Sequence, residues 1–367
     1  MQFPFRRYPE HRTMRIDALI LCTLIVSVIT LSALHAQTQR IAVAPFDSPD
    51  PTAVQTPDGF YCFVTGRGIP ILYSQNLLDW TRQGTVFSEN VPQWAAERIP
   101  GSKAIWAPDI VFHNGLYYVY YSVSTFGGQR SLIGLTVNKT LDSQSPDYKW
   151  EDRGIVLESH PDYTDYNAID SAFFTDADGK AYLLWGSYWT GIKGVEVDAN
   201  TGKPFAYREG DLKIPLNYKI IANRGTDKDT SIEAPYVIYR NGYYYLFTSR
   251  GNCCDGVKSD YRVVIGRGKS PLGPYMDKDG KRLDEGGGTL IIASDEKWKG
   301  PGHNGILRTT GHAKNSGDWM FLHAFDADEA KKGRLMQVRP LYWDDSGWFQ
   351  LGDVLSVPFE AFDFGMR

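Results

Sequence analysis

Residues 110–123 read IVFHNGLYYVYYSV, an apolar run, an Asn-Gly turn and a run rich in aromatic residues. Asn114-Gly115 between two β-rich runs is a strong hairpin signal, because both turn positions of a tight hairpin need a positive φ angle. Four further blocks repeat this order of features: residues 53–64, 172–188, 234–249 and 305–325, with turns at Asp58-Gly59, Asp178-Gly179, Asn241-Gly242 and, in the last, Gly311 and Gly317. Each block therefore opens with a predicted hairpin.

A polar residue stands near the start of the first apolar run in every block. These residues are Asp50, Asp109, Asp170, Glu233 and His303, with spacings of 59, 61, 63 and 70 residues. A repeat of this length has room for four strands and their loops, and such a period favours a stacked or radial architecture. We predict an all-β fold, a five-bladed β-propeller, whose first strands line a central channel and bring the five polar residues to one end. No amphipathic helix pattern suggests an α/β fold, and a two-sheet sandwich would not bring the five residues together.

The composition excludes several classes of protein. The 367 residues include 39 Lys+Arg and 43 Asp+Glu, a net charge of −4, so there is no basic footprint for nucleic acid. With 42% hydrophobic and 22% charged residues the chain is globular rather than disordered. Aromatic residues make up 14% of the chain, which favours strands and provides flat surfaces for stacking sugars or bases.

The first 36 residues form a separate segment. Four arginines precede an apolar stretch from Ala18 to Ala33, which is typical of a secretory leader. A membrane anchor is the alternative, but the small residues at the end of the stretch favour cleavage, with Gln37 as the new N-terminus. Leu34, three residues before that cut, departs from the preferred small residue. Met14 is an alternative start of the chain. No other segment is apolar enough to span a membrane. We expect a secreted or periplasmic protein in which residues 37–367 form one propeller domain.

Cysteine usage excludes a disulfide framework. Cys22 belongs to the leader, so the mature chain keeps an odd number: Cys62, Cys253 and Cys254. Because neighbouring cysteines rarely bridge, we interpret Cys253 and Cys254 as packed thiols rather than as a redox or metal site.

Carboxylates at the start of apolar strands are the residues that point to chemistry. Asp170 and Glu233 are flanked by Ile, Val and Ala, where a charged group is poorly solvated. A turn cap or a bond to a neighbouring N–H explains any single one of them. Three such carboxylates around one axis indicate glycoside hydrolysis, because that reaction needs two opposed carboxyl groups. A third carboxylate can keep one of them protonated.

Seven short motifs make the resemblance to a known family specific. They are DPTAV at 50–54, IWAPDI at 105–110, YYSVSTFG at 120–127, NAID at 167–170, WGSYW at 185–189, IEAPY at 232–236 and GPGHN at 300–304. In this order, over about residues 44–348, the chain resembles glycoside hydrolase family 43, and within it the endo-1,5-α-L-arabinanases. That resemblance implies a five-bladed propeller and an inverting mechanism.

The resemblance also implies roles for individual residues. Asp50 corresponds to the general base that activates water and Glu233 to the general acid that protonates the leaving oxygen. Asp170 corresponds to the carboxylate that raises the pKa of the acid and orients it, a role that like-charge repulsion also predicts. Asp109 has no chemical role in the family that we carry over, and we interpret it as structural.

Sugar-contacting residues follow from the same motifs. Trp106 and Phe126 resemble the aromatic walls of the arabinan groove, with ordinary packing between blades as the alternative. Residues that resemble the family's contacts at the cleavage point are Gly128, Asn167, Ser187, Tyr188 and Trp189. Tyr188 stands where relatives often carry Phe.

His303 resembles a family histidine beside a channel metal ion, commonly calcium, whose other ligands are mostly water. Calcium usually takes several protein oxygens, so the identity of the ion stays open. His113, His160, His312 and His323 are assigned to turns or to other strands. The strings starting at Asp176 and Asp277 lack the closing Glu of a calcium loop and are predicted hairpin turns.

We therefore expect an exported, inverting endo-1,5-α-L-arabinanase with arabinan or its oligosaccharides as substrate and no obligate protein partner. The alternatives are an exo-acting α-L-arabinofuranosidase or β-xylosidase of the same family, and a propeller that binds polysaccharide without cleaving it. Pro49 stands where many arabinanases have His, and Ser171 where Pro is usual. Both departures leave room for another cleavage pattern or furanoside.

Overall fold

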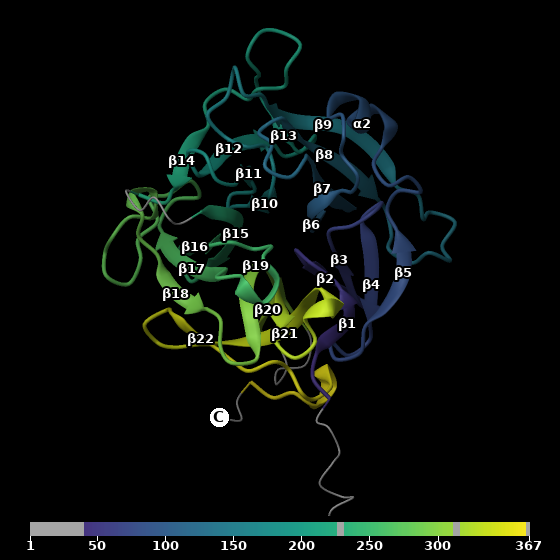
Figure 1. Ribbon diagram of the computed structural model, residues 1–367, viewed down its shortest axis with the longest axis vertical. Coiled ribbons are helices and arrows are strands. Elements are labelled where there is room, and N and C mark those ends of the chain that lie inside the picture. The colour runs from purple at the N-terminus through teal and green to yellow at the C-terminus, as the bar shows by residue number, and fades with distance from the viewer. Residues whose placement is uncertain (1–39, 226–230, 311–315, 365–367) are drawn as a thin grey trace, which may run out of the picture. The chain divides into compact units, whose positions relative to one another are not determined.

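Alternating strands and turns build five antiparallel sheets around a common axis (Figure 1). The computed structural model describes residues 40–225, 231–310 and 316–364; the predicted leader lies outside them. Residues from Ile41 onward form one compact unit. The predicted all-β, five-bladed propeller is confirmed.

Each blade has an inner strand near the axis and further strands outward (Figure 1). Blade 1 contains β2 (Thr52–Thr56), β3 (Gly59–Phe63), β4 (Pro70–Ser74) and β5 (Thr81–Thr85); blade 2 contains β6 (Trp106–His113), β7 (Leu116–Val123), β8 (Ser131–Asn138) and β9 (Glu151–Ser159); blade 3 contains β10 (Ala172–Thr175), β11 (Ala181–Trp185), β12 (Ile192–Asp198), β13 (Lys203–Pro204) and β14 (Lys219–Ala222). Blade 4 contains β15 (Ile232–Arg240), β16 (Tyr243–Arg250), β17 (Arg262–Gly268) and β18 (Thr289–Ile292); blade 5 contains β19 (Trp298–Arg308), β20 (Asp318–Asp326), β21 (Arg334–Trp343) and β22 (Phe349–Leu351). Short helices, all in connections, are α2 (Gln93–Arg98), η1 (Gly256–Lys258), η2 (Leu283–Glu285), η3 (Ala330–Lys332) and η4 (Phe359–Ala361).

The fifth blade joins the two ends of the propeller. Strand β1 (Val43–Asp47) pairs antiparallel with β21, so the beginning of the domain completes its last sheet. This pairing closes the ring of blades through main-chain hydrogen bonds rather than through a disulfide bond.

The hydrophobic core lies between neighbouring blades. Five clusters of buried side chains each combine residues of two adjacent blades, as where Phe60 and Cys62 of β3 pack against Trp319 and Phe321 of β20. Fully burying a side chain such as Phe321 contributes about 1.5–3 kcal/mol. The apolar, aromatic faces of the strands therefore hold the blades together.

The predicted hairpins form, although two of the turns differ in detail. Asn114 and Gly115 have φ angles of 49° and 77°, and Asn241 and Gly242 have 49° and 79°, as a tight primed turn requires. In the turns at residues 58–59 and 178–179 only the glycine has a positive φ. Gly311 lies outside the described residues.

The interpretation of the adjacent cysteines as packed thiols is wrong. Cys253 and Cys254 form a disulfide bond. They lie in the partly exposed loop between β16 and η1, where no strand pairing constrains the backbone between neighbours. Cys62 is a buried free thiol whose pKa is raised by burial.

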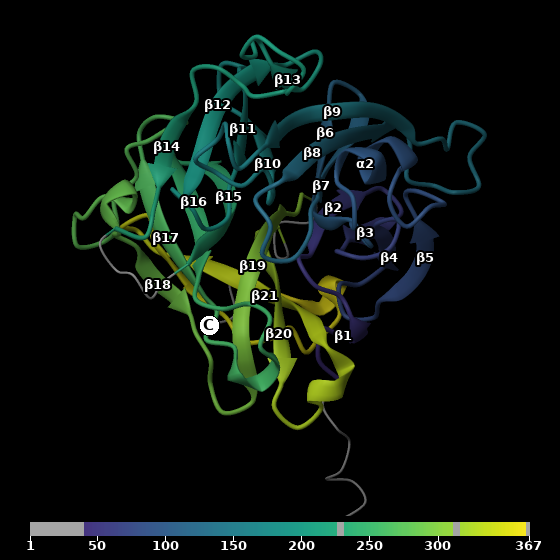
Figure 2. The same ribbon diagram turned by 45° about the horizontal axis from the view of Figure 1, so that its top comes forward.

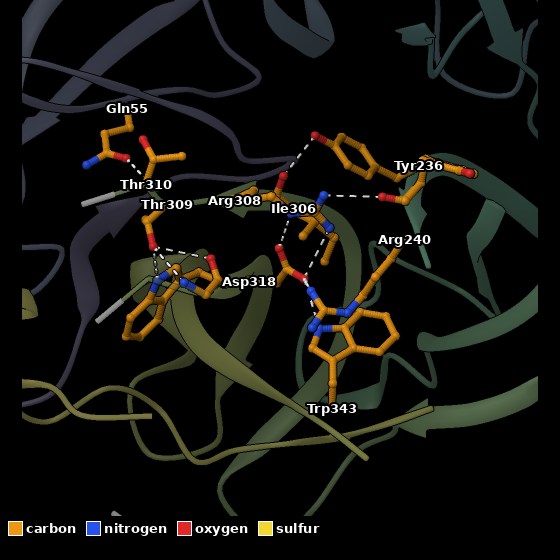
Figure 3. A network of polar contacts seen from close by, with 12 residues as sticks. Gln55, Tyr236, Arg240, Ile306, Arg308, Thr309, Thr310, Asp318 and Trp343 are labelled. Atoms are coloured by element: carbon orange, nitrogen blue, oxygen red, sulfur yellow. Dashed lines mark hydrogen bonds and ion pairs between the residues drawn. The ribbon is translucent and has the colours of Figure 1, made fainter. Parts of the chain in front are cut away.

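A buried carboxylate ties blades 4 and 5 together at the C-terminal ends of their inner strands. Asp318 accepts hydrogen bonds from Arg308 Nε at 2.7 Å, Trp343 Nε1 at 2.8 Å and Arg240 Nη1 at 3.3 Å (Figure 3). The side chain of Asp318 is 1% exposed, and these three donors offset the free-energy cost of burying the carboxylate. Across the described residues, the structure contains no helix long and apolar enough to span a membrane.

Candidate active site

One backbone feature recurs at the same end of all five inner strands. A residue other than glycine takes a positive φ there: Asp50 (55°), Ala107 (43°), Asp170 (58°), Ala234 (53°) and His303 (48°). Register shifts mark the strands at this point in β6, β15 and β19. Such conformations cost about 1–3 kcal/mol each and persist only where surrounding contacts impose them.

This feature corrects the predicted equivalence of the five polar residues. Asp50, Asp170 and His303 are structurally equivalent, but the equivalent residues in blades 2 and 4 are Ala107 and Ala234. Asp109 lies two residues after Ala107, and Glu233 lies one residue before Ala234. The sequence repeat alone does not reveal this offset, because the bulge changes the register inside the strand.

Five side chains near these positions lie on the second strands of the blades or two residues after those strands end: Thr65, Ser122, Ser187, Ser249 and His323. Three of them pair with the residue just before a positive-φ residue: Ser122 lies opposite Trp106, Ser249 opposite Glu233 and His323 opposite Gly302. We call these five side chains the bridging ring, because each makes a hydrogen bond to the next blade.

Four members of the bridging ring accept a backbone N–H from the next blade. Ala107 N–H donates to Thr65 Oγ1 at 2.7 Å, Asp170 N–H to Ser122 Oγ at 3.0 Å, His303 N–H to Ser249 Oγ at 2.9 Å and Asp50 N–H to His323 Nδ1 at 3.0 Å. The fifth member, Ser187, instead donates to Glu233 Oε2 at 2.6 Å, and Ala234 N–H donates to Asp170 Oδ2 at 3.1 Å. The ring thus fixes the strained backbone of four inner strands, and Asp170 fixes that of the fifth.

Asp50 lies in the most positive surroundings of the three candidate carboxylates. Its Oδ2 accepts a hydrogen bond from Thr65 Oγ1 at 2.5 Å, and its Oδ1 lies 3.3 Å from Nδ1 of both His303 and His323. Burial alone would raise the pKa of Asp50, but the two histidines and Arg334 outweigh burial and hold the pKa well below its usual range. Asp50 is therefore ionised at neutral pH.

Asp170 and Glu233 experience the opposite balance. Burial raises the pKa of Asp170, and the charges of Glu233 and Asp50 raise it further. Burial also raises the pKa of Glu233, with a contribution from Asp50, while Ser187, Tyr261 and His303 act in the opposite direction. Repulsion between Asp170 and Glu233 is mutual, so the pair retains a proton at a pH where an isolated carboxyl would lose it.

The site therefore combines a carboxylate held ionised with a carboxyl pair that retains a proton. These environments separate the roles of base and acid, which is the pattern that acid–base catalysis requires.

His303 can offer a ring nitrogen to a channel ion. Burial lowers the pKa of His303 while Asp50 opposes this shift, and the ring Nδ1 lies 3.3 Å from Asp50 Oδ1. Next to His303, both side-chain polar atoms of Asn304 are buried without a protein partner, as is Ser171 Oγ after Asp170. In the described part of the chain, no three His, Cys, Asp or Glu residues gather as a metal cage. His303 as a single imidazole donor fits an ion that keeps most of its water, and it does not fit a carboxylate cage.

The predicted aromatic walls differ in exposure. Phe126, in the β7–β8 loop, is 85% exposed, which excludes packing between blades as its role. Trp106 is half-buried at the start of β6, opposite Ser122. Tyr188 is 39% exposed, and its backbone N–H donates to Ile232 O at 2.9 Å, beside Glu233.

The other predicted contact residues occupy tightly built positions. A Cβ at Gly128 would lie 2.6 Å from Thr125 Oγ1 and 3.1 Å from Thr125 O, so a larger residue would require Thr125 to shift. Asn167 is buried, and its Oδ1 accepts a hydrogen bond from Ser131 Oγ at 2.6 Å. Tyr188 and Trp189 both have positive φ angles, 55° and 41°, in the β11–β12 loop.

Sequence reasoning missed a buried lysine that anchors this loop. Lys193 Nζ donates to Thr190 Oγ1 at 2.6 Å and to Thr190 O at 3.1 Å. Burial lowers the pKa of Lys193 to about 8. Nothing in the sequence around Lys193 distinguishes it from a surface lysine.

Sequence reasoning also missed most of the bridging ring: it placed His323 in a turn or on another strand and gave it no role beside Asp50. A usable signal was present: a hydroxyl or imidazole side chain follows each positive-φ residue by 15 to 20 positions. Asp109 is a different case, because Thr52 Oγ1 and Phe173 N–H donate to its two oxygens at 3.3 and 2.7 Å. Burial raises the pKa of Asp109 to about 7, and its contacts to blades 1 and 3 agree with a structural interpretation.

The fold and these carboxyl groups define the class of the protein as a propeller glycoside hydrolase. The sequence matches the model of glycosyl hydrolases family 43 over residues 40–349, so the chain belongs to that family.

Relatives of known name support this assignment. The chain is 39% identical over 308 residues to the extracellular exo-α-(1→5)-L-arabinofuranosidase ArbA of Cellvibrio japonicus, covering 84% of this chain and 87% of the relative. It is 38% identical over 303 residues to the extracellular endo-α-(1→5)-L-arabinanase 1 of Bacillus subtilis, covering 82% and 86%. The solved structure of Cellvibrio cellulosa α-L-arabinanase complexed with arabinohexaose superposes with a TM-score of 0.73 at 38% identity, covering 83% of this chain and 95% of that one.

Proposed function

We propose that the protein is an exported, inverting hydrolase of α-1,5-L-arabinofuranosidic bonds in arabinan, and that it attacks within the chain. The observation that carries the proposal is the opposite pKa shift of Asp50 and of the Asp170–Glu233 pair within one buried site. The relatives that act on α-1,5-linked arabinose support the choice of substrate.

Asp50 acts as the general base. Its ionised carboxylate takes a proton from a water molecule, which attacks the anomeric carbon from the face opposite the leaving group. His323 and Thr65 hold the carboxylate in place through the main-chain and Oδ2 contacts. Inversion at an α-linkage yields a β-configured reducing end.

Glu233 acts as the general acid. Ser187 positions Oε2, and the proton retained by the carboxyl is delivered to the glycosidic oxygen of the leaving sugar. Asp170 accepts the N–H of Ala234, the residue after Glu233, so it orients the acid as well as raising its pKa. In an inverting enzyme we expect base and acid to lie about 6.5–9.5 Å apart.

The exposed rings of Phe126 and Tyr188 and the half-buried Trp106 provide faces for stacking sugar rings. Release of single arabinose units from a chain end is the second candidate, which the name of the Cellvibrio japonicus relative favours.

Export rests on the predicted leader and on the extracellular relatives. We further propose one channel ion, with calcium as the first candidate, that His303 contacts. When bound, it would supply positive charge to the channel beside the carboxylates.

The proposal is tested by replacing Glu233. Glu233→Gln should lower turnover of linear arabinan by about 10²–10⁴-fold, the usual contribution of a general acid. Turnover of an aryl arabinoside with a good leaving group should fall much less, because that leaving group needs no proton. Equal loss on both substrates in a folded variant would contradict the assignment, and absence of turnover by the parent enzyme would favour a binding protein.

A further inference from the structure

A second pocket lies between blades 1 and 2. It has a volume of about 230 Å³ and is lined by Tyr61, Ile71, Tyr73, Gln83, Leu141, Asp142, Ser143, Gln144 and Tyr148. The first four belong to β3, β4 and β5, and the others to the β8–β9 loop. Figures 1 and 2 both show this loop beside β5.

The pocket is remote from the carboxylates. Asp50 precedes the inner strand β2, whereas Tyr61 lies in the middle of β3, opposite Val54, and the other lining residues of blade 1 lie farther out on β4 and β5. The β8–β9 loop follows the end of β8 at Asn138, which pairs with Tyr117 just after the β6–β7 turn. The pocket therefore lies against the outer strands β4 and β5 of blade 1, away from the inner strand, and the loop that completes it starts at the end of blade 2 opposite the active site.

The aromatic walls of the pocket are held in place. The rings of Tyr61 and Tyr73 lie 5.0 Å apart at a tilt of 58°. Tyr73 OH donates to Asp58 O at 2.6 Å, and Tyr148 OH accepts from Trp150 Nε1 at 3.1 Å. Rings that are already ordered lose little conformational entropy on binding, which favours a ligand that stacks on them.

The polar lining indicates a neutral ligand rich in hydroxyl groups. Gln83, Ser143 and Gln144 offer amide and hydroxyl groups, and Asp142 offers a carboxylate. None of the nine lining residues is Lys, Arg or His, so an anion would find no countercharge. Burial raises the pKa of Tyr61 to about 12, and Tyr73, Asp142 and Asp58 add smaller contributions.

We propose that this pocket is a second carbohydrate-binding site, which takes a short neutral stretch of an arabinofuranosyl chain. The identity of the sugar rests on the proposed function. The volume is below the roughly 300–1,000 Å³ of sites that enclose drug-sized ligands, so the pocket suits part of a chain that continues into solvent. Tyrosine rings pack against the C–H faces of the sugar, and the amides and the carboxylate bind its hydroxyl groups.

Such a site should promote the cleavage of polymers only. A chain held in this pocket raises the effective concentration of its other segments near the active site. An oligosaccharide too short to reach both sites gains nothing from the second one.

Binding is measured by calorimetric titration of linear arabinohexaose into Glu233→Gln, with and without Tyr148→Ala. Tyr239→Ala is the matched control, because this tyrosine is 39% exposed on blade 4, away from the pocket. We expect two sites in Glu233→Gln and in the control, and at least tenfold weaker binding at one site with Tyr148→Ala. A single site that Tyr148→Ala leaves unchanged would overturn the proposal.

The same substitution in the active enzyme separates the pocket from the catalytic site. Tyr148→Ala should lower kcat/KM on polymeric arabinan about 3- to 10-fold and leave kcat/KM on arabinotriose and melting unchanged. Equal loss on both substrates overturns the second site. If the parent enzyme cleaves arabinan but only one binding site is found, the proposal of a second binding site fails and the proposed function stands. If the parent enzyme does not cleave arabinan, the proposed function fails.

Discussion

Single residues decide which carboxyl group carries a proton. Asp50 and Asp170 occupy equivalent backbone positions, with φ angles of 55° and 58°. Their pKa values nevertheless shift in opposite directions, because histidines and Arg334 surround Asp50 and other carboxylates face Asp170. Neighbouring charges, rather than backbone geometry, therefore assign the chemical roles.

Asp170→Asn should move the alkaline limb of the pH–rate profile to lower pH. The amide keeps an oxygen for the N–H of Ala234 but removes the charge that repels the ionised form of Glu233. The pKa of Glu233 therefore falls, and the acid loses its proton earlier as pH rises. Profiles of kcat/KM measure the shift, with Asp109→Asn as the control, because both Asp109 oxygens bind groups between blades. An alkaline limb that stays in place in a folded, partly active Asp170→Asn enzyme would remove Asp170 from this role.

Removing a bound metal ion should lower melting temperature or activity, and adding calcium back should restore it. An ion that binds only the folded state stabilises by mass action, about 2.7 kcal/mol at 100 times Kd. His303→Ala should blunt the response, while His113→Ala, whose ring contacts Ala199 O, should not. The measurement is thermal melting with and without a strong chelator. Unchanged melting and activity after verified removal of metal would make His303 a channel residue only.

At the scale of elements, hydrogen bonds between blades hold strained strands in register. Each blade has an unfavourable φ at one inner residue; the bridging ring binds that residue from the neighbouring blade in four cases, and Asp170 binds Ala234 in the fifth. At the other end of β19 and β15, Asp318 performs a comparable task with Arg308 and Arg240 (Figure 3).

Asp318→Ala should lower the free energy of unfolding by about 2–3 kcal/mol. Removing one partner of a buried ion pair costs roughly 3–5 kcal/mol, and the value is smaller here because the side chains of Arg240 and Arg308 are 33% and 48% exposed. Urea unfolding measures the change. Glu196→Ala, in an exposed pair with Lys180, is the control and should cost less than about 1 kcal/mol. A loss for Asp318→Ala no larger than that of the control would show that the network contributes little.

At the scale of the whole molecule, the surface across the end of the propeller determines the mode of attack. A groove open at both ends lets a chain lie across the carboxylates and be cut internally. Viscosity of linear arabinan should then fall much faster than reducing ends appear, with short oligosaccharides as products. Release of arabinose alone from the first minutes, with viscosity falling in proportion, would favour the exo-acting candidate.

Local patterns in the sequence determined the strands, the hairpins and the number of blades. Alternating aromatic runs and Asn-Gly turns act over a few residues, so residues 110–123 and 234–249 could be interpreted without the rest of the chain. The ordered motifs indicated the family in the same way, since each of them is short and continuous.

Tertiary structure decided the rest. His323 reaches Asp50 across 273 positions, and β1 pairs with β21 only because the ring of blades closes. The offset between Glu233 and Ala234, the disulfide of Cys253 and Cys254, and the pocket beside Tyr148 also depend on backbone conformation or on neighbours distant in sequence. Local periodicity predicts which side of a strand is buried. It does not predict which charged side chain or loop from a distant segment lies beside that strand.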